Sequence, residues 1–177
     1  MKNFVLYFIL LASFISCKKE DDTNNNSWGT ISALRNGENW TGEISAVVND
    51  FPSDTGIIIN IHSVDKIKFG DDYLVFFKVP PIIDKYPLSM TSLYVKDSLI
   101  GSGYSIWVSD GHVLGDAYKL LEGDPIEDYI EITEISGDEI KGNFQVSYFR
   151  DNPEDPNRPT PDTLIFTDGR FHTRIRN

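Results

Sequence analysis

Polar and apolar residues alternate along much of this chain, most regularly over residues 140–148, where apolar or small residues occupy the even positions and polar residues the odd ones. A repeat of two residues predicts a β-strand with one buried and one solvated face. Similar alternation occurs over residues 40–48, 57–61, 104–108 and 129–135. No segment shows sustained i, i+3, i+4 spacing, so the pattern predicts strands rather than helices.

Residues 73–79 predict another strand, whose apolar face we expect to consist of the odd-numbered residues Tyr73, Val75, Phe77 and Val79. Pro80-Pro81 should end this strand, because proline cannot donate a ladder hydrogen bond. The next residues, 84–88, read as irregular, and residues 93–99 as a short strand. Residues 117–121 are consistent with either a strand or one helical turn.

Turn residues separate these segments. Asn36-Gly37 lies between two apolar segments and predicts a tight hairpin, since both residues tolerate a positive φ. Gly137-Asp138-Glu139 predicts another turn. Near the C-terminus the alternation changes phase at Asp168-Gly169, which indicates a bulge or a tight turn.

Roughly eight to ten strands with short connections favour an all-β fold, either an antiparallel β-sandwich or a small meander β-barrel. We place this fold in a single domain over residues 28–177, with no internal repeat. About 150 residues are enough to bury a sizeable core.

The N-terminus carries an export signal. Lys2 precedes an apolar run over residues 4–15, and a small residue, Ser16, follows it. A membrane-spanning helix needs roughly 20 apolar residues, so this run instead predicts a signal peptide over residues 1–16. Cys17 comes next and is the only cysteine in the chain. Residues 17–27 are charged or polar beyond Cys17 and should form a flexible tether.

Phe14-Ile15-Ser16-Cys17 resembles the lipobox of bacterial lipoproteins, although that family usually has Leu where this chain has Phe14. The resemblance implies cleavage before Cys17 and acylation of its thiol. Two or three acyl chains give durable attachment to a bilayer. A plain secretory peptide with a chance cysteine is the alternative interpretation.

The lysines and acidic residues over positions 18–22 are similar to those of Bacteroidota lipoproteins exported to the outer face of the outer membrane. The domain also resembles small Bacteroidota lipoproteins of unassigned function. The shared features are an opening Trp, an Asn-Gly pair followed by an aromatic residue, and the segments at 86–88, 130–133, 140–144 and 164–171. This resemblance implies an all-β domain in the cell envelope. Together with the run over positions 18–22, it implies a lipid anchor in the outer membrane and exposure at the cell surface, with the periplasmic face as the alternative. It implies no functional residues.

Charge narrows the range of partners. The chain has 16 Lys+Arg against 27 Asp+Glu, a net charge of −11. Nucleic-acid backbones attract basic surfaces, so we expect no nucleic-acid partner. Simple solubility is sufficient to explain the acidity.

No catalytic constellation is recognisable. The strained G-x-S-x-G turn of serine hydrolases is absent. His62, His112 and His172 share no metal-ligand spacing; we expect His62 and His172 to be solvated on polar strand faces and His112 to lie in a loop. Acidic loops at 110–116, 124–128 and 151–162 match no calcium-loop pattern. We therefore predict no catalytic residues, no metal site and no cofactor.

Trp107 lies on the minority face of its strand, between Ser105 and Ser109. An exposed aromatic there is a candidate contact for a sugar or a protein partner, unless the segment over residues 80–103 covers it. Ser98 and Thr163 occur in Asp-Ser/Thr-Leu tripeptides, which resemble O-glycosylation sites on exported Bacteroidota proteins.

These observations favour a non-enzymatic binding or accessory module of the cell envelope, with a glycan, a peptide or a protein as partner. A polysaccharide hydrolase with two paired carboxylates is one alternative. A purely structural envelope protein is the other.

Overall fold

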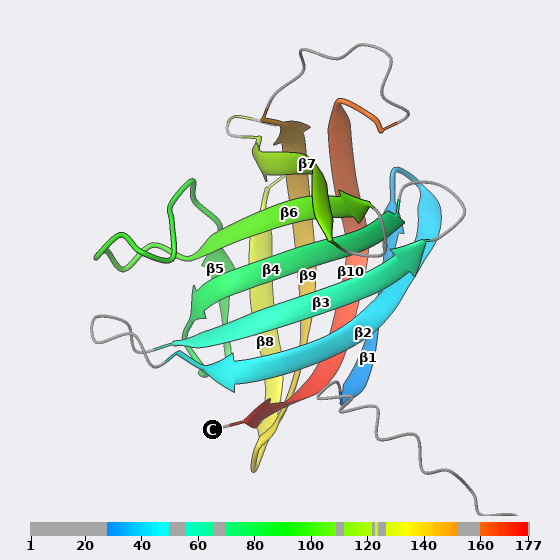
Figure 1. Ribbon diagram of the computed structural model, residues 1–177. Coiled ribbons are helices and arrows are strands. Elements are labelled where there is room, and N and C mark those ends of the chain that lie inside the picture. Colours follow the sequence, from blue (N-terminus) through cyan, green and yellow to red (C-terminus); the bar gives the residue numbers. More distant parts are fainter. Residues whose placement is uncertain are drawn as a thin grey trace, which may run out of the picture.

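The protein is all-β in the computed structural model, which describes residues 28–49, 56–65, 70–108, 112–121, 123, 127–151 and 160–176 (Figure 1). Within these residues the secondary structure consists of strands: β1 (Gly29–Arg35), β2 (Glu38–Val48), β3 (Ile57–Asp65), β4 (Gly70–Val79), β5 (Asp84–Pro87), β6 (Gly101–Val108), β7 (Val113–Leu120), β8 (Tyr129–Ser136), β9 (Glu139–Arg150) and β10 (Thr163–Arg176). The predicted signal peptide, Cys17 and the tether lie outside the described residues.

All ten strands belong to one sheet, and eight of them form a closed ring of paired neighbours. The ring runs β1-β2-β3-β4-β6-β7-β9-β10 and closes where β10 pairs with β1. β9 pairs with β7 through residues 148–150 and with β8 through residues 139–145, so β8 branches from the ring and carries β5 at its outer edge. Of the two predicted architectures, these pairings match the meander barrel, because most neighbours in the ring are also neighbours along the chain.

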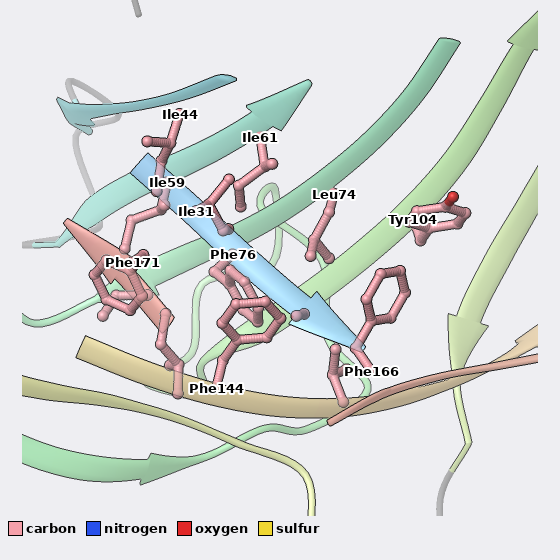
Figure 2. Packing of buried hydrophobic residues seen from close by; sticks show 14 of the residues in the cluster. Ile31, Ile44, Ile59, Ile61, Leu74, Phe76, Tyr104, Phe144, Phe166 and Phe171 are labelled. Carbon is pink, nitrogen blue, oxygen red and sulfur yellow. The ribbon is translucent and has the colours of Figure 1, made fainter. Parts of the chain in front are cut away.

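The interior is filled by apolar side chains from opposite walls. In Figure 1, β2, β3, β4 and β6 pass in front of β8, β9 and β10 and cross them. Figure 2 shows Phe76 of β4 and Phe144 of β9 between these two walls, with ring centroids 5.4 Å apart. Tyr148 and Phe166 are likewise buried completely. Burial of these rings supplies the main stabilising free energy of the fold.

The predicted turns are confirmed. Asn36 and Gly37 join β1 to β2 with φ values of 50° and 81°, as a two-residue hairpin turn requires. Pro80 follows the last residue of β4. The phase change near the C-terminus is a bulge within β10, where the register with β9 shifts between Phe166 and Gly169 and Asp168 has a φ of 52°.

Two local predictions are wrong, and the structure decides a third that the sequence left open. Residues 84–87 are not irregular but form β5, an edge strand that tolerates the terminal Pro87 because only one side pairs. Residues 93–99 contain turns and bends instead of a strand. Residues 117–120 belong to strand β7 rather than to a helical turn.

The buried face of β4 also differs from the prediction. Leu74 and Phe76 are the residues that enter the core, and each is 1 % exposed, whereas Tyr73 lies on the outer face. Both phases of this strand are apolar, so alternation alone does not identify the inner face. A register shift opposite Ile57–Ile59, with Lys78 at a φ of 63°, then places Val79 inside as well.

Candidate functional site

A pocket forms where β2 and β3 separate. The two strands pair from Val48–Ile57 to Glu43–His62, and there their ladder ends. Beyond that point β2 pairs only with β1, and β3 pairs only with β4. The strands approach closely just before they part, since a Cβ at Gly42 would lie 2.7 Å from the His62 carbonyl oxygen. The pocket includes Arg35 and Asn39 from the two sides of the β1–β2 hairpin.

The pocket has a volume of about 430 Å³ and is open to solvent. This volume lies within the range of small-molecule sites. Its walls are mainly polar and consist of Arg35, Asn39, Trp40, Thr41, Gly42, Glu43, His62 and Ser63. These side chains provide both hydrogen-bond donors and acceptors.

A buried ion pair lies at the inner wall. The Arg35 guanidinium donates to the carboxylate of Asp72, which is 0 % exposed, and to the Tyr104 hydroxyl at 3.1 Å. Burial raises the pKa of the Asp72 carboxyl above its usual value, and the charge of Arg35 opposes that rise. Burial also raises the pKa of the Tyr104 hydroxyl, which therefore stays neutral. The positive charge of Arg35 is thus largely compensated inside the protein.

Three polar atoms in this region have no hydrogen-bond partner: Nε1 of Trp40, Nε2 of His62 and Oδ1 of Asp72. The indole N–H of Trp40 faces the Asp72 carboxyl, but the two groups do not reach hydrogen-bond geometry. A buried polar atom without a partner is destabilising. All three atoms are shielded from bulk water, so a ligand hydroxyl reaches them only when a neighbouring side chain moves.

An aromatic row continues from the pocket across the outer face of the sheet. We define it as His62 of β3, Tyr73 of β4 and Trp107 of β6. The His62 and Tyr73 rings stack with centroids 4.6 Å apart, and the Tyr73 and Trp107 rings meet at 77° with centroids 6.3 Å apart. The indole N–H of Trp107 donates to Ser105 Oγ at 3.0 Å, which holds the ring in place. Tyr73 is 38 % exposed.

The sequence-predicted site residues do not gather at one place. Trp107 lies on the outer face as its phase predicts, half-buried in the aromatic row. Ser98 lies in the connection between β5 and β6, and Thr163 begins β10; both are exposed. Their modification stays a prediction, as does that of Cys17.

Of the three histidines, only His62 reaches the pocket, where it is half-buried rather than solvated, with Nε2 shielded from water. His172 is half-buried rather than solvated, with Nε2 3.1 Å from Glu139 and its ring against Trp28. His112 is exposed at a turn, as expected. Within the described part of the chain, no three His, Cys, Asp or Glu side chains come together as a metal site would require. Each of the three acidic loops includes residues outside that part.

Arg35 in the pocket wall and Asp72 behind that wall both carry a signal in the sequence. Arg35 has the same phase as Ile31 and Ala33, and Asp72 has the same phase as Leu74 and Phe76. A charged residue in the buried phase of a strand indicates an ion pair or a functional group, since unpaired charges are rarely buried. Nothing in the sequence shows that β2 and β3 part at Glu43.

Comparisons with known proteins reveal no relative. No protein-family model matches the chain, and neither a curated protein nor a solved structure matches it. Among the residues that the structure describes, none lies in a helix with the length and apolar character needed to cross a bilayer.

Proposed function

We propose that this protein is a non-enzymatic binding module of the bacterial cell envelope, anchored in the outer membrane through acylated Cys17. The anchor follows from the lipobox-like Phe14-Ile15-Ser16-Cys17. The binding role rests chiefly on one observation, the open polar pocket between β2 and β3. Its partner is a glycan, a peptide or a protein at the cell surface, and the acidic net charge of −11 disfavours nucleic acid.

The groups at the pocket favour binding over hydrolysis. A glycosidase needs two carboxyl groups that flank the bond to be broken. Glu43 lines the pocket, but the Asp72 carboxyl lies behind its wall, fully buried and paired with Arg35. Although the pKa of Asp72 is raised, as suits a general acid, its carboxyl is out of reach of a ligand in the pocket. No other feature of the described residues favours the hydrolase.

The anchor is tested by intact mass. The membrane-extracted protein is compared with a Cys17→Ala variant. We expect the mass of residues 17–177 plus acyl groups, and the loss of this mass in the variant. An unmodified, soluble wild-type protein would overturn the anchor. The same spectra test Ser98 and Thr163, because O-glycosylation adds hexose masses that Ser98→Ala and Thr163→Ala remove.

The pocket is tested by ligand-induced thermal stabilisation of the intact chain, since a ligand that binds only the folded state raises the melting temperature. The probes are cellobiose, maltose, N-acetylglucosamine, diglycine and adenosine. We expect at least one to stabilise the wild-type protein and not Thr41→Lys, whose longer cationic side chain would fill the mouth of the pocket. Thr30→Lys is the matched control, because Thr30 is exposed at the far end of β1. No response to any probe would contradict ligand binding, and released reducing ends with a polysaccharide would contradict the non-enzymatic role.

A further inference from the structure

From the pocket and the aromatic row together we infer a single elongated site for a neutral oligosaccharide. The pocket holds one end of the oligosaccharide, and the solvent-exposed parts of His62, Tyr73 and Trp107 contact the sugar rings that follow. This inference rests on the proposed binding function and specifies its ligand.

The pocket suits hydroxyl groups. Each sugar hydroxyl both donates and accepts, so it pairs best with walls that offer both kinds of group. Asn39 and Thr41 can do either, Glu43 accepts, and the guanidinium of Arg35 donates. The pocket is therefore matched to a ligand that carries many hydroxyls rather than to an apolar one, for which a mostly apolar wall is usual.

The aromatic row suits the apolar C–H faces of a sugar ring. A pyranose ring exposes C–H groups on its faces, and these pack against the π-system of an aromatic side chain. The three rings of the row come from three adjacent strands and succeed one another at 4.6 and 6.3 Å. His62 belongs to both parts, since it lines the pocket and stacks on Tyr73. The row therefore extends the pocket without a break.

Charge favours a neutral sugar over an acidic one. Asp72 compensates the charge of Arg35, and Glu43 adds a carboxylate at the pocket. The whole chain carries a net charge of −11. A uronic-acid polymer would approach this surface against electrostatic repulsion.

The test measures binding of soluble polysaccharides to the intact chain by affinity gel electrophoresis. The neutral probes are laminarin, dextran, galactomannan and xyloglucan, and the acidic probe is polygalacturonate. We expect retardation by at least one neutral polymer and none by polygalacturonate. The double variant Tyr73→Ala/Trp107→Ala should weaken that binding by about tenfold or more, which corresponds to about 1.4 kcal/mol. Tyr94→Ala is the matched control, because Tyr94 is an 81 % exposed aromatic outside the row.

The outcomes separate the inference from the function on which it rests. If diglycine or adenosine occupies the pocket and no saccharide binds, the ligand class is wrong but the binding module stands. If a neutral polymer binds equally well to Tyr73→Ala/Trp107→Ala, the aromatic row is not part of the site. If Thr41→Lys binds the polymer as well as the wild-type protein does, the pocket is not part of it. If polygalacturonate alone binds, the argument from charge is wrong.

Discussion

The centre of the barrel and its polar end are both buried, but they differ in how their polar atoms are paired. At the centre, Ser102 donates to the Val75 carbonyl oxygen at 2.8 Å and accepts from the Tyr148 hydroxyl, so both hydroxyls are used. At the polar end, the Arg35–Asp72 pair leaves Oδ1 of Asp72 without a partner. Unpaired buried polar groups weaken a fold.

The difference also follows the strand pairing. The centre lies where β3 pairs with both β2 and β4, whereas the polar end lies where the β2–β3 ladder has stopped. We therefore expect substitutions at the centre to act on stability alone, and substitutions at the polar end to act on both stability and binding. The four predictions below test that division.

The largest effect should come from the centre. Phe144→Ala removes a ring that packs on Phe76 and lies against Gly169, and it leaves a cavity. We expect unfolding free energy to fall by about 4 kcal/mol, measured by urea denaturation. The control is Phe149→Ala on the same strand, whose half-buried side chain should cost much less. Equal losses for the two variants would show that the centre is not the tightly packed region.

Arg35→Met should cost about 3 kcal/mol at neutral pH, because it leaves the buried Asp72 carboxyl without its cation. The folded-state pKa of Asp72, already raised by burial, would rise further. A raised pKa contributes stability that is present below the unfolded value and lost as pH rises through the folded value. The penalty should therefore grow as the pH rises above the unfolded-state pKa of an aspartate, about 4.

Asp72→Asn in the Arg35→Met background removes the titrating group. The double variant should show a penalty that is nearly independent of pH over the same interval. A pH-dependent penalty that persists in the double variant would assign the titration to another group.

Tyr104→Phe should cost about 2 kcal/mol, since it removes the hydroxyl that accepts from the buried Arg35 guanidinium at 3.1 Å. Hydrogen bonds to a charged group contribute more than those between neutral groups. Thermal denaturation measures the change. A stability equal to that of the wild-type protein would show that the Tyr104 hydroxyl contributes little to the pairing of Arg35.

Tyr148→Phe is the matched change at the centre and should have the smallest effect, about 1 kcal/mol, because Ser102 keeps its bond to Val75. It should leave polysaccharide binding unchanged, whereas Tyr104→Phe should weaken binding by disturbing Arg35 at the pocket wall. Weaker binding for Tyr148→Phe would remove the distinction between the two regions.

The sequence predicted strands well where only one phase was apolar. The alternation over residues 140–148 and the hairpin at Asn36-Gly37 both match β9 and the β1–β2 turn. It failed in β4, where Leu74 and Phe76 are as apolar as Val75 and Phe77. It failed again at β5, because a four-residue edge strand depends on its neighbour β8 rather than on its own pattern. Local alternation identifies a strand. When both of its faces are apolar, only packing against neighbouring elements determines which face is buried.

By itself, the sequence determined the all-β class, the hairpin turns and the bulge at Asp168-Gly169, because each depends on residues close together in the chain. It also predicts an anchor at Cys17. The tertiary structure alone decided that the sheet closes into a ring, since closure joins β1 to β10. It likewise decided that Arg35 meets Asp72 and that His62 connects a pocket to Tyr73 and Trp107. These contacts join residues far apart in the chain, where no local pattern specifies the partner.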